Sequence, residues 1–322
     1  METPLSKHIK AVHQGAAWFR AAFWNQHPEL AIITGTSGPK SLSKHFEPDS
    51  VELDLPADIF PQPRTEGHEH RVQFGSIRGV KVIVIKGRAH FWEEENDPYR
   101  PAVMARALGL WGVNNLALTN AAGGLDLSLR PGTICVVADH NSKHMGHSPL
   151  RGRHEDMPET FGLPHAPMNP VYDRKFNKLA AQVEYTSGTV VENARYVMVP
   201  GPEFETAMEA DELKALGANI VGMSSIPEAM VWRAMANACI DGKLVKRPMR
   251  VMLLSLVTNR VPNQLLTDES AVTHESVQEF VAKKDEAFAG YLAGVIEMVG
   301  KDLRGEIKSS PEKRLRVSRL GR

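Results

Sequence analysis

The stretch Asn115-Leu116-Ala117-Leu118-Thr119, continued by Asn120-Ala121-Ala122-Gly123-Gly124, shows the pattern that decides the fold class of this chain. A short, nearly continuous apolar run is typical of a strand that is buried on both faces of a sheet. Here the run ends in small and polar residues. The same pattern recurs at residues 30–34, 80–86, 133–138, 220–221 and 251–257.

Helical stretches separate these predicted strands. We expect helices at residues 99–110, 206–216, 227–240 and 273–298. The repeated strand–helix–strand order predicts an α/β fold, a single domain with a central mixed, mostly parallel β-sheet flanked by helices. Ligands bind beyond the carboxyl ends of strands in such sheets. We therefore expect a site built from the residues that follow the strands.

The composition is that of an ordinary globular protein. The chain has 322 residues, of which 42% are hydrophobic and 24% charged. Because 38 Lys and Arg balance 38 Asp and Glu, nothing in the overall charge argues for a nucleic-acid or membrane partner. We expect one domain over residues 1–300. Residues 301–322 hold eight Lys or Arg against three Asp or Glu, and we expect a flexible basic tail there.

The two cysteines and the N-terminus predict a cytoplasmic protein. Cys135 and Cys239 both lie in apolar runs, which favours buried thiols of a reducing compartment over a disulfide. No apolar stretch approaches the ~20 residues that span a bilayer. Charged and His residues interrupt the N-terminal segment, so it lacks a signal-peptide core. We expect the N-terminal segment to form an amphipathic helix, with an organellar transit peptide as the alternative. The apolar face of this helix is formed by Ile9, Val12, Ala16, Phe19, Ala22 and Phe23.

A strand-to-helix junction carries the clearest signal for a ligand. The strand-like run at 196–199 ends in Pro200-Gly201-Pro202, and Phe204 and Glu205 follow. Thr206 and Glu209 have the spacing of a helix capping box. An aromatic ring beside a carboxylate suits a flat polar heterocycle, because the ring packs on it and the carboxylate accepts its N–H groups. The alternative is a solvated acid beside a core Phe.

Several predicted strand ends offer groups that bind anions. Gly35-Thr36-Ser37-Gly38 supplies hydroxyl and backbone N–H groups, although its spacing is not that of a Walker loop. Arg88 and His90 alternate along the chain and share a face, and Glu93 and Glu94 could orient His90. Ser224 and Ser225 add hydroxyls, and Ser225 with Glu228 has capping-box spacing. Together these groups predict a phosphate-like ligand.

Other catalytic motifs are weak or absent in the sequence. His140, His144 and His147 suggest a metal site, but the surrounding Asn, Ser, Gly and Pro residues disfavour the helix that such spacing needs. The sequence contains no Gly-x-Ser-x-Gly elbow, and no Gly-x-Gly-x-x-Gly follows the first predicted strand. We therefore predict no metal.

Six segments together resemble the trimeric purine nucleoside phosphorylases, the family that includes methylthioadenosine phosphorylase. They occur in the order of that family and extend over roughly residues 5–298. They are Gly87-Arg88-Ala89-His90, Thr119-Asn120-Ala121-Ala122-Gly123-Gly124, Pro149-Leu150-Arg151-Gly152, Gly201-Pro202-Glu203-Phe204-Glu205-Thr206, Gly222-Met223-Ser224 and Thr258-Asn259-Arg260-Val261.

The resemblance implies a role for each matching residue. The implied phosphate ligands are the hydroxyl of Thr36 or Ser37, the backbone N–H of Ala121, and the side chains of His68, Arg88, His90 and Ser224. The implied purine ligands are Ala122, Phe204, Glu205 and Asn259. The implied ribose contacts are Trp92, Met223, His274 and, from a neighbouring subunit, Phe161. The implied catalytic residues are His90, Glu205, Asn259 and His274.

The resemblance also implies the reaction. A purine nucleoside phosphorylase cleaves the N-glycosidic bond with phosphate, needs no metal or organic cofactor, and works as a homotrimer in purine salvage. An Asn at 259 can donate to a 6-oxygen while Glu205 accepts from N1–H, which favours inosine and guanosine, ribo- or deoxyribo-, over adenosine or methylthioadenosine. Methylthioadenosine or xanthosine phosphorylase is the alternative within the family. A metal-dependent hydrolase or a non-catalytic nucleoside-binding protein is the alternative outside it.

Three departures from the family pattern bear on these roles. The phosphate loop has one residue more than usual, which leaves open whether Thr36 or Ser37 meets phosphate. Trp92 stands where a tyrosine is common, and indole only donates a hydrogen bond. The segment from Asp241 to Pro248 is an addition that we expect to be a surface loop.

Overall fold

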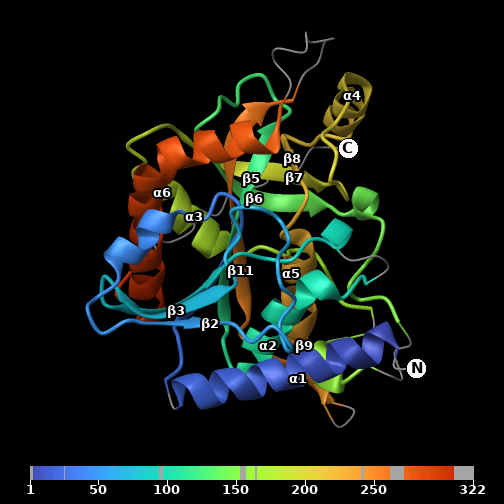
Figure 1. Cartoon of the computed structure of the whole chain (residues 1–322), viewed down its shortest axis with the longest axis vertical. Helices are drawn as coiled ribbons and strands as arrows, with labels where there is room; N and C mark the ends of the chain where they lie inside the picture. Colours follow the sequence, from blue (N-terminus) through green and yellow to red (C-terminus); the bar gives the residue numbers. More distant parts are fainter. Residues whose placement is uncertain are drawn as a thin grey trace, which may run out of the picture.

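Every apolar run that ends in small or polar residues forms a strand of one nine-stranded sheet in the computed structural model of the chain (Figure 1). The structure describes residues 3–24, 26–93, 97–152, 157–163, 165–240, 243–261 and 272–307. The predicted strands are β1 (Leu30–Thr34), β4 (Val80–Lys86), β5 (Asn115–Gly124), β6 (Ile134–Asn141), β7 (Val190–Met198), β8 (Ile220–Gly222) and β11 (Arg250–Arg260). The sequence did not predict β2 (Val51–Asp54) or β3 (Arg71–Ile77).

The sheet is mixed, as predicted, and part of it closes on itself. Its order is β11-β6-β7-β8-β5-β1-β4-β3-β2, and β11 also pairs with β5. Strands β5, β11, β6, β7 and β8 therefore form a closed ring. The pairs β1–β4, β1–β5, β5–β11, β6–β7 and β7–β8 are parallel. The pairs β2–β3, β3–β4, β5–β8 and β6–β11 are antiparallel.

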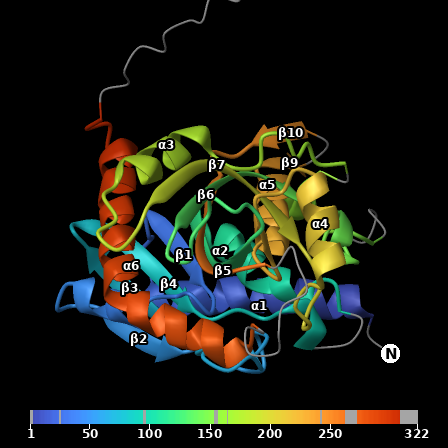
Figure 2. The same cartoon turned by 90° about the horizontal axis from the view of Figure 1, so that it is seen from above.

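Helices cover both faces of this sheet, so its central strands are buried on both sides (Figures 1 and 2). Successive side chains of a strand point to opposite faces. Ala31 and Ile33 accordingly join the core under α1 (Pro4–Phe23), α2 (Val103–Trp111) and α5 (Ile226–Met235). Leu30 and Ile32 join the core under α3 (Arg174–Gln182) and α6 (His274–Leu303). Helix α4 (Ala207–Ala215) packs beside β7 and β8 in a small third cluster.

The helix predicted at 227–240 is wrong at its C-terminal end. Helix α5 ends at Met235, and β9 (Asn237–Ile240) pairs with β10 (Lys243–Lys246) in a separate antiparallel sheet. Pairing with β10 satisfies the backbone groups that a longer helix would have used, and tertiary contacts of this kind override local propensity. The added segment that we expected to be a surface loop thus supplies β10.

Short 3-10 helices fill several connections. The helix predicted from residue 99 begins as η3 (Arg100–Ala102) before α2, and Gly112 ends α2 with φ of 116°. The others are η1 (Lys40–His45), η2 (Phe91–Glu93), η4 (Lys143–Met145) and η6 (Glu159–Phe161).

The ends of the chain and the cysteines add three observations. Helix α6 runs to Leu303, so the boundary predicted at residue 300 falls inside a helix, and residues 308–322 of the predicted tail lie outside the described residues. Cys135 is a buried free thiol. Over the described ranges, none of the helices combines the length and apolar character that a membrane crossing requires.

Candidate active site

A cavity of about 510 Å³ opens where β1, β4 and β11 end and where β5 passes β8. A volume of ~300–1,000 Å³ is typical of small-molecule sites. The predicted site residues that line it are Thr36, His90, Trp92, Ala121, Ala122, Phe204, Glu205, Met223, Ser224, Asn259 and His274. Ser37, His68, Arg88 and Phe161 are not among the lining residues. Lining residues that sequence reasoning missed are Arg64, Thr65, Glu66, Asn120 and Thr258.

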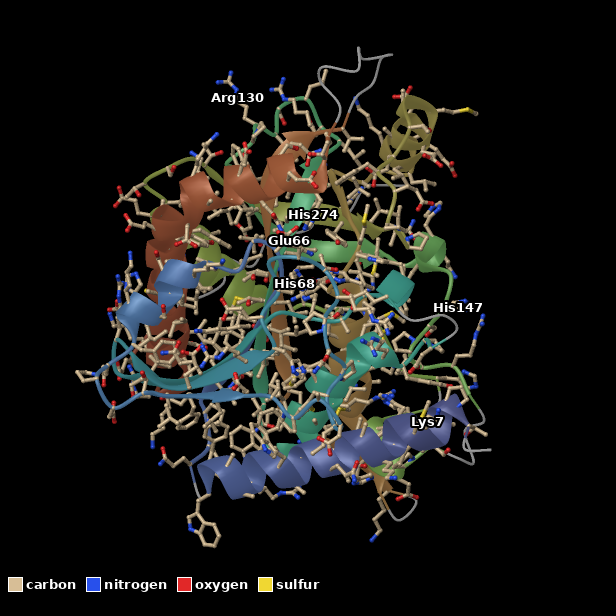
Figure 3. The ribbon with its side chains drawn as sticks, viewed as in Figure 1. Lys7, Glu66, His68, Arg130, His147 and His274 are labelled. Atoms are coloured by element: carbon tan, nitrogen blue, oxygen red, sulfur yellow. The ribbon has the colours of Figure 1, made fainter. Side chains whose placement is uncertain are left out.

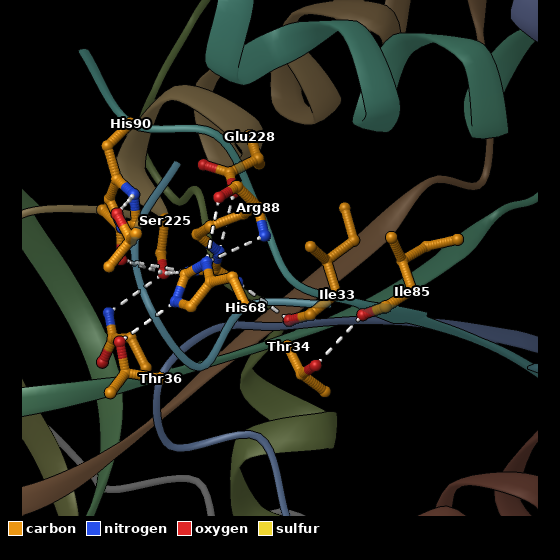
Figure 4. A network of polar contacts seen from close by, with 12 residues as sticks. Ile33, Thr34, Thr36, His68, Ile85, Arg88, His90, Ser225 and Glu228 are labelled. Carbon is orange, nitrogen blue, oxygen red and sulfur yellow. Dashed lines mark hydrogen bonds and ion pairs between the residues drawn. The ribbon is translucent and has the colours of Figure 1, made fainter. Parts of the chain in front are cut away.

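His68 does not line the cavity, but it holds the lining residue Thr36 in place. Thr36 Oγ1 lies 3.0 Å from His68 Nε2, and His68 Nδ1 lies 3.0 Å from the carbonyl oxygen of Arg88 (Figure 4). Burial, together with the nearby His90, lowers the pKa of His68 to about 3. The imidazole is therefore neutral near pH 7. It links the loop after β1 to the loop after β4 without adding a charge.

The structure separates the two hydroxyls of the first loop. Thr36 lines the cavity, whereas Ser37 is fully buried outside it and its hydroxyl has no partner among the described residues. This geometry favours Thr36 as the residue that meets a ligand.

Arg88 lies behind the cavity wall instead of lining it. Its Nη1 donates to Ser224 Oγ at 3.1 Å and to Ser225 Oγ, and its Nη2 donates to the carbonyl oxygen of Ile33 at 2.8 Å. Its Nε lies 3.3 Å from Glu228 Oε1, and both side chains are 2% exposed (Figure 4). Arg88 therefore reaches the cavity through Ser224, which lines it.

The capping box predicted at Ser225 and Glu228 is incomplete. Ser225 has φ of 74° and its side chain makes no capping bond. The Glu228 carboxylate lies beside Arg88, and the backbone N–H groups of Ser225 and Glu228 also act on it. Burial raises the pKa of Glu228, while the charge of Arg88 opposes that rise.

A second buried carboxylate orients His90. His90 Nδ1 lies 3.1 Å from Glu93 Oε1, which also accepts from Thr65 Oγ1 at 2.7 Å. Burial would raise the pKa of Glu93, but the bonds from His90 and Thr65 outweigh it and lower that pKa to about 2. Because an ionised Glu93 can only accept, His90 carries its proton on Nδ1 and leaves Nε2 as an acceptor. Glu94, the other predicted partner of His90, lies outside the described residues.

Phe204, Glu205 and Asn259 also line the cavity. The predicted capping box is present, since Glu209 N donates to Thr206 Oγ1 at 3.3 Å and Thr206 N donates to Glu209 Oε2 at 2.8 Å. Glu205 takes no part in this cap, and no cation among the described residues pairs with it. Burial raises the pKa of Glu205. Phe204 is 39% exposed, so it is no core residue.

A β-bulge aims Asn259 into the cavity. The pairing register between β11 and β5 shifts between Val257 and Asn259, and such a bulge redirects the side chains that follow it. Thr258 Oγ1 donates to Asn259 Oδ1 at 2.9 Å. The amide oxygen is thus engaged, and the NH₂ group remains as a donor for a ligand.

Trp92 and Met223 form part of the cavity wall. Trp92 stacks on His90 with ring centroids 4.1 Å apart and planes 21° apart. A Cβ at Gly201 would lie 2.7 Å from Met223 Sδ and 3.0 Å from Trp92, and Gly201 has φ of 74°. A glycine at this position therefore lets both walls approach. His274 begins α6, and its Nε2 lies 3.2 Å from the carbonyl oxygen of Glu66; the two residues lie close to His68 (Figure 3).

Two side chains that the sequence singled out make internal contacts in this structure. Phe161 is only 3% exposed within its own subunit, where it packs against His8 and the guanidinium of Arg106. Its ring packs inside the single chain, and the predicted contact with a neighbouring subunit stays a prediction. His140 bonds to the hydroxyl of Tyr172 at 3.0 Å, and over the described ranges no group of three or more His, Cys, Asp or Glu side chains could hold a metal ion.

Comparisons with known proteins agree with this arrangement. The phosphorylase superfamily model matches residues 29–297. A purine nucleoside phosphorylase of Bos taurus is 32% identical over 297 residues, which cover 89% of this chain and 96% of that protein. Purine nucleoside phosphorylase 1 of Geobacillus stearothermophilus is 28% identical, with 91% and 98% covered.

Solved structures give the same result. The crystal structure of Schistosoma mansoni purine nucleoside phosphorylase in complex with inosine has a TM-score of 0.75 and 32% identity, and 90% of this chain and 96% of that chain are covered. The structure of the same enzyme in complex with adenosine has a TM-score of 0.74 and 30% identity, with 90% and 97% covered. With the family model, the relatives and the fold in agreement, the chain belongs to the purine nucleoside phosphorylase family of the phosphorylase superfamily.

Proposed function

We propose that this chain catalyses the reversible phosphorolysis of inosine and guanosine, in their ribo- and deoxyribo- forms, to the free purine and (deoxy)ribose 1-phosphate. This is the reaction of a pentosyltransferase of purine salvage, EC 2.4.2.1. The observation that carries the proposal is that two chemically different sets of side chains line one cavity. Hydroxyl groups and His90 form one set, and Glu205 and Asn259 form the other. A phosphate suits the first set and a purine suits the second, with the sugar between them.

At the phosphate end, the ligands are Thr36, His90, Ser224 and the backbone N–H of Ala121. Arg88 acts from behind Ser224, where its charge favours a dianion. With Nδ1–H held by Glu93, His90 presents Nε2, which accepts a hydrogen bond from the hydroxyl of a monohydrogen phosphate dianion. As the glycosidic bond breaks, its electron pair leaves with the purine, whose negative charge the NH₂ group of Asn259 stabilises, and the ribosyl group becomes positive. The nearby phosphate dianion stabilises that charge and then attacks the anomeric carbon, so catalysis rests on positioning and preorganised electrostatics.

At the purine end, the polarity of the two side chains selects a 6-oxopurine. Asn259 keeps its NH₂ as a donor because Thr258 occupies its carbonyl oxygen, and an ionised Glu205 is an acceptor. A 6-oxopurine offers an acceptor at O6 and a donor at N1, which matches both groups. A 6-aminopurine offers the reverse, and each unpaired buried group would cost ~1–3 kcal/mol. Phe204 faces the purine ring, and Ala122 contacts it from β5.

The test is a phosphate-dependence assay with inosine, guanosine, xanthosine, adenosine and methylthioadenosine. We expect hypoxanthine or guanine to form only when phosphate is present. Faster cleavage of methylthioadenosine or adenosine than of inosine would refute the 6-oxopurine assignment. Release of hypoxanthine without phosphate would point to a hydrolase and refute the phosphorylase.

We further propose a homotrimer on the basis of the family resemblance. Sedimentation analysis should then give three times the chain mass of 35.6 kDa. The absence of a cofactor and the cytoplasmic location stay predictions. Dialysis against a chelator should leave the phosphorolysis rate unchanged, and a lost rate would contradict the first of them.

A further inference from the structure

One carboxylate ties the phosphate loop (residues 35–39) to α6. Asp285 Oδ1 accepts from the backbone N–H of Lys40 at 2.6 Å, and Asp285 Oδ2 accepts from that of Ser41 at 2.9 Å. These are the first two residues of η1, the short helix that follows the loop. Asp285 lies on α6, 245 residues after Lys40. Because each oxygen takes one N–H, the carboxylate fixes both the position and the direction of the chain where the loop ends.

The start of η1 depends on this acceptor from outside. The first N–H groups of a helix have no partner within the helix. They are usually satisfied by the side chain of the residue before it, but that residue is Pro39, and it makes no capping bond. A carboxylate at this point satisfies the N–H groups and complements the positive end of the helix. Asp285 therefore supplies from α6 the cap that the local sequence lacks.

The loop itself has little room to change shape. Gly38 N donates to the carbonyl oxygen of Gly35 at 2.7 Å, and a Cβ at Gly38 would lie 2.9 Å from the same oxygen. Thr36, which lines the cavity, bonds to His68 at 3.0 Å. The loop is thus held at two points, by His68 near its start and by Asp285 just after its end. A shift at either anchor is therefore passed on to Thr36.

Other contacts between η1 and α6 do not replace these two bonds. Leu42 of η1 is buried in the core that α6 covers, which holds the two helices together but is not directional. Lys44 pairs with Glu286 at 2.9 Å, yet both side chains are largely exposed, and an ion pair in water contributes little. Glu286 is therefore a matched control at the position next to Asp285.

We propose that Asp285 is a positioning residue that raises the affinity for inorganic phosphate by holding the phosphate loop, and with it Thr36, in the binding conformation. This inference rests on the proposed phosphorolysis. Asp285 is not among the residues that line the cavity, so it acts through the loop. Without its two bonds the loop is ordered only when phosphate binds, and that ordering weakens the affinity. Glu205 and Asn259 have no contact with η1, so the affinity for the nucleoside stays.

The test measures KM for phosphate and KM for inosine separately in two variants. Asp285→Ala removes both acceptors, and Asp285→Asn keeps one carbonyl oxygen. We expect KM for phosphate to rise ~10-fold in the first and by a smaller factor in the second, while KM for inosine at saturating phosphate stays within about twofold. Glu286→Gln should change neither value. An unchanged KM for phosphate in Asp285→Ala, or an equal rise of both KM values, would overturn the proposal.

A second control separates positioning from a general loss of stability. Asp302 lies near the other end of α6, is 2% exposed and stands 3.3 Å from Arg250 Nη1. Asp302→Asn should therefore lower the melting temperature and leave KM for phosphate unchanged. If Asp302→Asn raises KM for phosphate as much as Asp285→Ala does, destabilisation accounts for both effects and the proposal fails.

A double-mutant cycle tests whether Asp285 acts through Thr36. In a Thr36→Val background, Asp285→Ala should raise KM for phosphate by less than twofold further. A full additional rise would refute the coupling. The experiments also separate the two levels of inference. If wild-type protein fails to cleave inosine with phosphate, the proposed function fails; if it cleaves inosine but the Asp285 variants keep the wild-type KM for phosphate, only the role of Asp285 fails.

Discussion

The buried pair of Arg88 and Glu228 gives a prediction whose size follows from the structure. The guanidinium and the carboxylate are each 2% exposed and lie 3.3 Å apart. Glu228→Leu removes the negative partner at similar volume and leaves the positive charge of Arg88 buried. Breaking such a pair from one side costs ~3–5 kcal/mol, because the remaining charge loses both water and its partner. With a shift of ~2 °C for each kcal/mol in a large domain, the melting temperature should fall by roughly 6–10 °C.

The matched control removes both charges. Arg88→Met combined with Glu228→Leu leaves no buried ion, and replacing a whole buried pair by apolar residues is often neutral or better. We therefore expect the double variant to melt above the Glu228→Leu single variant while phosphate turnover is lost. Thermal unfolding followed by circular dichroism, at one protein concentration and without phosphate, compares the melting temperatures, and a phosphorolysis assay with inosine checks the loss of turnover. The reasoning fails if Glu228→Leu melts within about 2 °C of wild type, or if the double variant is the less stable of the two.

Three further predictions concern the cavity itself. Thr36→Val should raise KM for phosphate at least ~5-fold, and Ser37→Ala should leave it within about twofold, because of these two residues only Thr36 lines the cavity. The reverse order in steady-state assays would refute this assignment. Burial raises the pKa of Glu205, so its carboxylate gains a proton and stops accepting N1–H at a higher pH than an exposed Glu would. As the pH falls through that pKa, kcat/KM for inosine should therefore decrease. A pH profile of Glu205→Gln with the same break would contradict this prediction. Asn259→Ala should lower kcat/KM for inosine by ~10-fold or more with little change in phosphate affinity, and equal losses of both would count against its place at the purine end.

The apolar runs predicted the positions of the buried strands, whereas β2, β3 and the full length of β5 were not predicted. β1 and β4 have the predicted bounds, since their apolar runs end abruptly. β5 was expected to end at residue 119, yet it continues to Gly124 because β11 pairs along its whole length. The small residues at its end are thus still strand. A distant partner supplies this information, and no local pattern contains it.

The sequence predicted which residues lie near the cavity better than it predicted where their side chains point. Residues after the strands do line one cavity. The Arg88 side chain is held by Ile33 and Glu228, which are remote from it in the sequence. Its position behind Ser224 could therefore not be predicted from the local sequence. The same holds for Asp285, whose partners are backbone N–H groups at the start of η1. A side chain bonding to remote backbone groups leaves no sequence signature, because nearly every residue provides them.

The closed ring of strands has a consequence for biosynthesis. β11 begins at Arg250, long after its partner β5 has ended at Gly124. At a ribosomal rate of ~5–20 residues per second, the gap lasts on the order of ten seconds. During that time the edges of β5 and β6 that β11 will occupy carry unpaired backbone groups, and open edges of this kind recruit other chains. We therefore expect a chain that stalls before β11 to expose these strand edges and to aggregate more readily than the full chain.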